Sequence, residues 1–422
     1  MQVEVIAIGT ELLLGQIVNT NAAEIGARLA EAGLDHFHQV VVGDNLDRMA
    51  DAITTALARA DAVIITGGLG PTQDDMTRQA ICAVTGRSME FDQDHADHLA
   101  AWFARRGREL PESNLRQAEY PSGAELIPNA KGTAPGLRLE IQGTWLFALP
   151  GVPAELHPML DDTVMPMLAE LSGGNRIVVS RLLRTWGESE SAISDAVADI
   201  YESLVNPTMA FLASGGEIKL RLTAAAETKS DAMSLIEPVE KQLRDRLGDL
   251  VFAVDSDTVE TMVLDACGSR GWSLATAESA TGGRIAARLT GVAGASKVFR
   301  GGIVAYNNDA KEDLLGVSHE MLVEVGAVSP ETALAMAAGA AERLGADVVV
   351  AVTGSAGPEP QEQDVGTMIV AVRTPEASRA RVIKMPGDRE RVLTYTTTAA
   401  LHLLRLAVTG AWSEQRWVPT TQ

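Results

Sequence analysis

The chain has 422 residues, of which 46% are hydrophobic and 22% charged, and its formal net charge is −21 at pH 7. This length exceeds what a single hydrophobic core organises, so we expect two or three domains, and the composition excludes extensive disorder. The acidic balance, without any stripe rich in lysine and arginine, argues against nucleic acid as a direct partner, because a phosphate backbone would be repelled.

The usual signals for export and for membrane insertion are missing from the sequence. No apolar run approaches the roughly 20 residues that span a bilayer, and residues 1–4 lack the basic start of a secretory signal. The two cysteines, Cys82 and Cys267, stand far apart in helix-like stretches, which is typical of free thiols in a reducing compartment. We therefore expect a cytoplasmic protein that does not contact a membrane.

The first part of the chain alternates strand and helix patterns. Apolar runs predict strands at residues 3–8, 37–42, 61–66 and 145–149, and helical spacing predicts helices at residues 21–32 and 46–60. This alternation predicts a largely parallel sheet covered by helices, with ligand-binding loops at the carboxyl ends of the strands. We place this α/β domain at residues 1–172.

Glycines and acidic residues follow one of these strands. Candidate ligand-binding glycines, which would let backbone amides approach an anionic ligand, are Gly67, Gly68 and Gly70. Candidate oxygen ligands for a divalent metal ion are Asp74, Asp75, Glu11 and Asp44. A purely structural interpretation is also open, in which the aspartates favour the start of the next helix and the glycines form a tight turn.

A small α+β connector is predicted at residues 173–254. A linker pattern at residues 171–175 precedes it, strands are expected at residues 177–183 and 218–225, and helices at residues 188–204 and 231–247. It contains no obvious catalytic cluster, so we interpret it as a spacer or an oligomerisation element.

A second α/β unit is predicted at residues 255–410. The expected strands are residues 272–277, 298–306, 347–352 and 367–373, and the expected helices are residues 258–270, a segment opening near Thr281, residues 330–344 and residues 389–406. Residues 411–422, which include Trp412 and Trp417, form a tail without an assignment. The predicted fold class is therefore α/β, with two α/β domains joined by the connector.

Ser279 is the strongest candidate nucleophile. It lies between a predicted strand and a helix whose unpaired N–H groups would stabilise an oxyanion or bind phosphate. No histidine stands close by, but Lys311 follows the next strand, and a lysine with a lowered pKa replaces histidine in Ser-Lys hydrolases. The structural alternative is that Ser279 caps the helix and Lys311 is a solvated surface lysine.

Several motifs in this half of the chain occur in one order and resemble a known family. They are Glu278-Ser279, Thr281-Gly282-Gly283, Gly301-Gly302 leading to Tyr306 and Lys311, Gly326 to Ser329, Thr353-Gly354 with Ala356-Gly357-Pro358, Val365-Gly366-Thr367 and Pro386 to Arg389. This set resembles the C-terminal domain of the CinA (competence- and damage-inducible) family, the nicotinamide mononucleotide deamidases.

The resemblance implies an amidohydrolase that needs no metal and converts nicotinamide mononucleotide to nicotinate mononucleotide and ammonia. It implies Ser279 as nucleophile, Lys311 as general base and Tyr306 as an assisting group. Candidate substrate-binding residues are Thr281, Gly282, Gly283, Thr353, Gly354 and Arg389. Arg389 would bind a phosphate bidentately. The alternative is that Arg389 is a surface residue at the start of a helix. One departure is the loop 358–364, which lacks the glycines and the lysine that family members often carry there.

The first domain resembles the rest of the same family through Gly9 to Leu13, Asn19-Thr20-Asn21, Gly67 to Thr72, Asp74-Asp75 with Thr77, Asn129 to Gly136 and Leu149 to Pro153. This resemblance implies a molybdopterin-binding-like fold with metal-dependent ADP-ribose pyrophosphatase activity, and a homodimer. Two alternatives stay open: the first domain only binds a pterin or a nucleotide, or the protein is a non-enzymatic interaction protein of competence or DNA damage.

Overall fold

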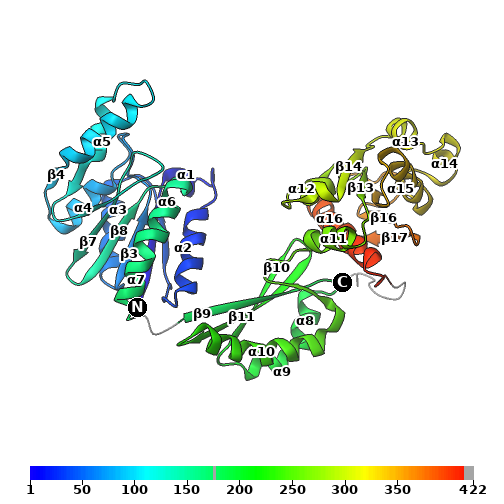
Figure 1. The fold of residues 1–422 in the computed structure, drawn as a ribbon, viewed down its shortest axis with the longest axis horizontal. Helices are drawn as coiled ribbons and strands as arrows, with labels where there is room; N and C mark the ends of the chain where they lie inside the picture. Colours follow the sequence, from blue (N-terminus) through cyan, green and yellow to red (C-terminus); the bar gives the residue numbers. More distant parts are fainter. Residues whose placement is uncertain (174–176, 413–422) are drawn as a thin grey trace. The chain divides into compact units, whose positions relative to one another are not determined.

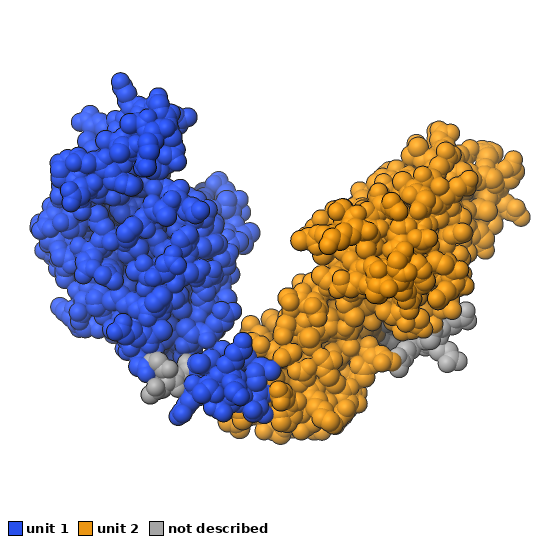
Figure 2. All heavy atoms as spheres, in the orientation of Figure 1, with its two compact units in different colours: residues 1–179, 224–234 blue, residues 180–223, 235–422 orange. Residues whose placement is uncertain are grey.

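The computed structural model describes residues 1–173 and 177–412. It divides into two compact units, residues 1–179 with 224–234 and residues 180–223 with 235–422, which are coloured separately in Figure 2. The last part of the predicted linker at residues 171–175 and the tail residue Trp417 lie outside the described residues. Among the described residues, no helix combines the length and the apolar character that crossing a bilayer requires.

The N-terminal domain is built on a six-stranded sheet of order β2-β1-β3-β8-β7-β6, of which β2, β1, β3 and β8 run parallel (Figure 1). Its strands are β1 (Val3–Ile8), β2 (Gln39–Val42), β3 (Ala62–Thr66), β6 (Glu125–Ile127), β7 (Gly136–Ile141) and β8 (Thr144–Leu149). The short antiparallel pair β4 (Met89–Phe91) and β5 (Glu119–Pro121) lies outside this sheet. The fold is α/β, as predicted, although β6 and β7 are antiparallel strands that the alternation did not predict.

Helices cover both faces of this sheet because the buried strands carry apolar side chains on alternate sides. Helices α2 (Thr20–Glu31), α6 (Pro153–Met159) and α7 (Met165–Leu171) pack on the face that carries Val3 and Val5. Helices α3 (Leu46–Leu57) and α4 (Thr77–Thr85) pack on the face that carries Ile6 and Ile8. The remaining helices are α1 (Thr10–Leu13) and α5 (Gln93–Ala104). Two apolar layers therefore hold the strand ends in place.

The middle region forms a four-stranded sheet of order β10-β11-β9-β12. Its strands are β9 (Ile177–Thr185), β10 (Thr208–Ser214), β11 (Glu217–Ala226) and β12 (Val251–Val254), and its helices are α8 (Glu190–Ala196), α9 (Ala198–Ser203) and α10 (Lys229–Leu247). The single helix predicted at residues 188–204 is wrong: Val197, with φ −119° and ψ 12°, leaves the helical range and separates α8 from α9. Strand β10 was not predicted.

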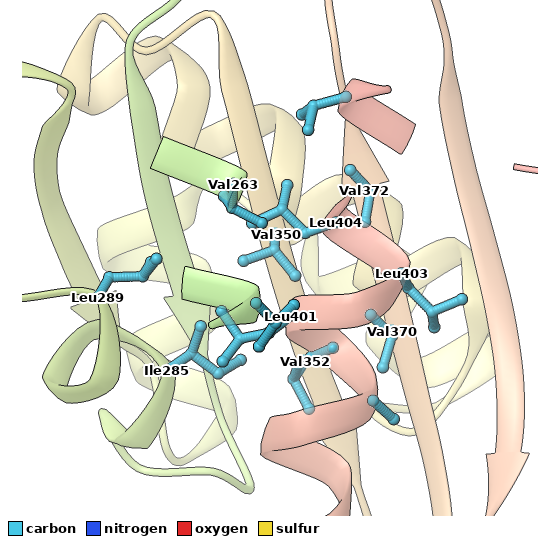
Figure 3. Close-up of a cluster of buried hydrophobic side chains, with 14 of the residues drawn as sticks. Val263, Ile285, Leu289, Val350, Val352, Val370, Val372, Leu401, Leu403 and Leu404 are labelled. Atoms are coloured by element: carbon cyan, nitrogen blue, oxygen red, sulfur yellow. The ribbon is translucent and has the colours of Figure 1, made fainter. Parts of the chain in front are cut away.

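The C-terminal domain contains a five-stranded sheet of order β14-β13-β15-β16-β17. Its strands are β13 (Leu274–Glu278), β14 (Phe299–Val304), β15 (Val348–Gly354), β16 (Thr367–Arg373) and β17 (Ser378–Lys384). Its helices are α11 (Val259–Ser269), α12 (Arg284–Thr290), α13 (Asn308–Leu315), α14 (His319–Val325), α15 (Pro330–Leu344) and α16 (Arg389–Val408). Helices α11, α12 and α16 cover one face, where Leu401 and Leu404 pack near Val350 and Val372 (Figure 3), and α15 covers the other.

Helix α12 begins later than the sequence predicts. It was expected to open near Thr281, but its first helical residue is Arg284. Gly282 and Gly283 have φ of 60° and 97°, and residues in this left-handed region do not continue a right-handed helix. A turn therefore separates Ser279 from the helix, and this turn shapes the site.

A buried polar contact joins the middle sheet to the C-terminal domain within the second unit. His402 of α16 is fully buried, and its Nε2 lies 3.0 Å from a carboxylate oxygen of Glu217 in β11. Arg405 Nε donates to His402 Nδ1 at 3.4 Å, so the neutral imidazole carries its proton on Nε2 and donates it to Glu217. The ring of Trp186 stacks on His402 with 4.4 Å between ring centroids.

Candidate functional site

The parallel strands of the C-terminal sheet end at one edge and bring the predicted catalytic residues there. Glu278, the last residue of β13, pairs with Val304 of β14 on one side and with Val352 of β15 on the other. Ser279 follows β13 directly, and Tyr306 follows β14 by two residues. The Ser279 hydroxyl accordingly donates to the Tyr306 carbonyl at 3.4 Å.

Ser279 and Lys311 are both buried at this edge. Their exposed fractions are 6% and 3%, so the alternative of a solvated surface lysine is wrong. Burial lowers the pKa of the Lys311 ammonium, and the carboxylate of Glu362 opposes this shift. Lys311 Nζ donates only a long bond of 3.5 Å, to the Asn307 carbonyl. No hydrogen bond joins Ser279 to Lys311 in the described part of the chain, and such catalytic bonds often tighten only when substrate binds.

The amides at the start of α12 are not available to a ligand, which corrects the sequence-based expectation. The fully buried carboxylate of Glu278 accepts hydrogen bonds from the amides of Gly283 and Ile285 at 3.0 Å and of Ala286 at 2.8 Å. The alternative in which Ser279 caps the helix is also wrong, because the N-cap is Gly283 and no side chain caps there. The Glu278 carboxylate, at the end of β13, accepts these amides in place of an N-cap side chain.

Two other amides remain free beside the nucleophile. Among the described residues, the N–H groups of Ala280 and Thr281 have no hydrogen-bond partner, whereas the amide of Ser279 donates to Val352 and that of Gly282 to Ser279. The hydroxyl of Thr281, a residue that is 1% exposed, is buried without a partner. Donors that directly follow a nucleophilic serine are placed as an oxyanion hole requires.

Arg389 and Tyr306 meet although they lie far apart in sequence. Arg389 Nη2 donates to the Tyr306 hydroxyl at 2.7 Å, and its Nη1 donates to the Gly357 carbonyl at 2.5 Å. Arg389 forms no ion pair with a carboxylate in the part of the chain that the structure describes. Its charge therefore remains uncompensated beside the strand edge, as phosphate recognition requires.

The remaining substrate-binding candidates of this domain have structural contacts of their own. The hydroxyl of Thr353 donates to the Ala327 carbonyl at 2.8 Å and is buried, and Gly354 lies against Met368. Gly282 and Gly283 form the turn before α12. Thr353 therefore ties the end of β15 to Ala327 and does not offer its hydroxyl to a ligand. The free backbone donors beside Ser279 are those of Ala280 and Thr281.

The predicted residues of the N-terminal domain line one cavity of about 610 Å³. Its walls include Gly67, Gly68, Gly70, Glu11, Asp44, Asp74 and Asp75. A methyl group on Gly67 would come within 2.3 Å of the Ile8 carbonyl, so only glycine fits this close approach between β1 and the loop after β3. The hydroxyl of Thr77 donates to the Gly67 carbonyl at 2.8 Å and fixes the loop on α4.

Carboxylates dominate this cavity. Five acidic residues line it, and its lining within the described chain contains no lysine or arginine; the acids are Glu11, Asp44, Asp74, Asp75 and Glu155. Among the described residues, no three or more His, Cys, Asp or Glu side chains are grouped so that they could hold a metal ion. Part of the reason is local bonding, since Asp44 accepts from the Thr10 amide and Asp75 from the Thr72 amide, both at 2.8 Å.

A divalent ion nevertheless suits this lining. Mg²⁺ is usually held by one or two carboxylates together with substrate phosphates and water, not by a complete protein cage. The pair Asp74 and Asp75 offers such ligands, and a hydrogen bond from the Thr72 hydroxyl lowers the pKa of Asp74 and keeps it ionised.

Comparison with known proteins assigns all three regions. A chain of Frankia casuarinae called a CinA-like protein is 46% identical, over 97% of this chain and 97% of its own. The chain belongs to the CinA family. Family models match residues 4–170 (probable molybdopterin binding domain), 180–253 (damage-inducible protein CinA KH domain) and 256–408 (CinA C-terminal domain).

The chain is also similar to other proteins of this kind. A competence-damage inducible protein of Moorella thermoacetica is 44% identical, over 96% of this chain and 98% of its own. The crystal structure of the protein CinA from Thermoplasma acidophilum is 35% identical, covers 40% of this chain and 99% of its own, and has a TM-score of 0.37.

Three residues of these CinA sites were missed by sequence reasoning. Glu155 of α6 lines the N-terminal cavity, and its carboxylate accepts a hydrogen bond from the Asn129 side chain at 2.6 Å. The signal that could have found it was an acid two residues after the motif that ends at Pro153. Glu278 was part of a family motif, but no role was assigned to it. The signal that could have found it was an acidic residue at the end of an apolar strand. Glu362 lies in the loop of residues 358–364, and nothing in its local sequence pattern indicates which groups it contacts.

Proposed function

We propose that the C-terminal domain is a nicotinamide mononucleotide amidohydrolase. The observation that carries this proposal is the joint burial of Ser279 and Lys311 at one strand edge, with two free amides directly after the serine. Arg389, whose charge no carboxylate of the described chain neutralises, adds a phosphate-binding group. Membership of the CinA family is consistent with this activity and does not by itself name the substrate.

In this mechanism Lys311 acts as the base. Its burial favours the neutral amine, which accepts the proton of Ser279 while the serine oxygen forms a bond to the carboxamide carbon. The amides of Ala280 and Thr281 donate to the resulting oxyanion. When the C–N bond breaks, the proton returns from Lys311 to the leaving nitrogen and ammonia departs. Water then hydrolyses the acyl ester, which releases the carboxylate product and regenerates the serine.

The test is ammonia release from nicotinamide mononucleotide by the full chain after treatment with a chelator. We expect wild-type turnover and its loss in Ser279→Ala and in Lys311→Ala. Ser296→Ala and Lys297→Ala are matched controls, because both residues are exposed in the same domain. A Ser279→Ala variant that retains full turnover would refute the assignment, and inactive folded wild type would point to another amide.

We also propose that the N-terminal domain hydrolyses ADP-ribose with a divalent metal ion. The supporting observation is a cavity lined by five carboxylates and no lysine or arginine of the described chain, which would repel a diphosphate unless cations accompany it. Asp74 and Asp75 would hold the ion, and the bound ion would polarise the phosphoanhydride. The glycine loop would supply amides to the phosphates.

Release of AMP from ADP-ribose in the presence of Mg²⁺ tests this second activity. We expect Asp74→Asn to abolish it, while Asp94→Asn, an exposed aspartate of α5, leaves it unchanged. Binding of ADP-ribose without turnover would favour the binding-only alternative, and pterin binding without ADP-ribose binding would favour the cofactor-binding one.

A further inference from the structure

The loop of residues 358–364 is fixed at both ends to the proposed amidohydrolase site. At its start, Arg389 Nη1 donates to the Gly357 carbonyl at 2.5 Å, and Arg389 Nη2 donates to the Tyr306 hydroxyl at 2.7 Å. Towards its end, Glu362 accepts the Val328 amide at 2.9 Å. Val328 stands one residue before Ser329, the N-cap of α15, and the positive end of this helix favours an ionised carboxylate there.

This anchoring holds Glu362 against the turn that precedes α15. A methyl group added to Gly326 would come within 2.6 Å of a Glu362 oxygen, so the carboxylate lies directly against the turn between α14 and α15. The adjoining Ala327 carbonyl accepts from Thr353 at the end of β15, next to the strand that leads to Ser279. The Glu362 carboxylate also opposes the lowering of the Lys311 pKa that burial causes.

The charge of Glu362 is not cancelled by a contacting cation. The loop carries three acids and no lysine or arginine, namely Glu359, Glu362 and Asp364. Asp364 lies 3.6 Å from Lys384, whereas Glu362 forms no ion pair in the described residues. A lysine that acts as a base is neutral, so Lys311 does not neutralise Glu362 in the reactive state either. Glu362 is exposed, and its carboxylate is therefore available to a cationic ligand.

We propose that Glu362 makes this site selective for a substrate whose reacting carboxamide is borne on a cationic ring. The inference rests on the proposed amidohydrolase function and specifies its substrate class. The ring of nicotinamide mononucleotide is a pyridinium with a permanent positive charge, and the carboxamide is attached directly to it. Glu362 stabilises this ring by charge, while Arg389 binds the phosphate at the other end of the same loop. In this proposal the loop supplies an acidic group, Glu362, where a cationic ring would bind.

The test compares two substrates that differ in ring charge. Nicotinamide mononucleotide and its 1,4-dihydropyridine form carry the same carboxamide and phosphate, but only the first ring is cationic. The ratio of their kcat/KM values is measured for the full chain, for Glu362→Gln and for Asp364→Asn. Glutamine keeps a carbonyl oxygen for the Val328 amide and removes the charge, and Asp364→Asn removes a charge that Lys384 already compensates.

We expect Glu362→Gln to lower this ratio about three- to fivefold, the upper part of the range for an exposed ion pair, and Asp364→Asn to leave it within twofold. An unchanged ratio in Glu362→Gln, or an equal fall in both variants, would overturn the proposal. If wild type releases ammonia from neither nucleotide, the amidohydrolase function itself fails. The ratio of the two dissociation constants, measured by titration calorimetry in wild type and Glu362→Gln, then decides whether charge selectivity exists.

Discussion

Replacing Glu278 by glutamine tests whether a buried carboxylate organises the nucleophile turn. In the structure one carboxylate oxygen accepts the amides of Gly283 and Ile285, and the other accepts that of Ala286. If the glutamine carbonyl keeps the first two bonds, its NH₂ group faces the third amide, donor against donor. Loss of one hydrogen bond to a charged group, with its partner left buried, costs about 1.5–3 kcal/mol.

This cost is local, so it is best measured by hydrogen exchange across residues 279–290. We expect the amides at the start of α12 to exchange roughly ten- to hundredfold faster in Glu278→Gln, which corresponds to that free energy. Ammonia release should slow by roughly 10- to 100-fold, less than outright loss of an oxyanion donor causes. Glu324→Gln, an exposed glutamate of α14, is the control. Wild-type exchange in Glu278→Gln would refute the reasoning.

Three further predictions follow from the same structure. Because burial lowers the pKa of Lys311 and only the neutral amine is a base, kcat/KM should rise with pH and level off below the ordinary lysine pKa of about 10.5, and Lys311→Arg should be inactive; an active arginine variant would contradict this. Arg389→Ala should raise KM for nicotinamide mononucleotide by about 10- to 100-fold, with little change for the riboside that lacks the phosphate; equal losses on both would exclude a phosphate contact. Burial lowers the pKa of His402 from 6.5 to about 4. Between these two pH values His402 is protonated in the unfolded chain and neutral in the folded chain. The free energy of unfolding should therefore fall between about pH 6.5 and pH 4, by about 3 kcal/mol in urea titrations, and His402→Phe should remove this slope.

The position of Ser279 was predictable because it depends on local pattern. A parallel strand that ends in a turn places the next residue at the ligand-binding edge, and the predicted strand at residues 272–277 ends one residue before β13 does. The burial of Lys311 was not predictable in the same way. It depends on how α13 packs beside the sheet, and the same sequence pattern fits a solvated lysine.

The error at the start of α12 has a definite physical cause. Sequence reasoning treats the first amides of a helix as free, because capping residues are sought just before the helix. Here the acceptor is Glu278, five residues before Gly283 and at the end of a buried strand. Only the fold shows that β13 and the turn bring this carboxylate back to the helix. Glu155 was missed for a related reason, since it reaches the N-terminal cavity from a segment far beyond the glycine loop.

The two proposed activities would bind phosphate by opposite electrostatic means, which is why we propose a metal ion for only one of them. The C-terminal site has its own cation in Arg389. Its guanidinium contacts Gly357 and Tyr306 and forms no ion pair with a carboxylate of the described chain. The N-terminal cavity has only acids among its charged lining residues, so its amides alone would face a diphosphate across five carboxylates. At the short distances inside a cavity salt does not screen such repulsion. A divalent ion held by Asp74 and Asp75 would offset this repulsion, and those carboxylates would then serve as its ligands.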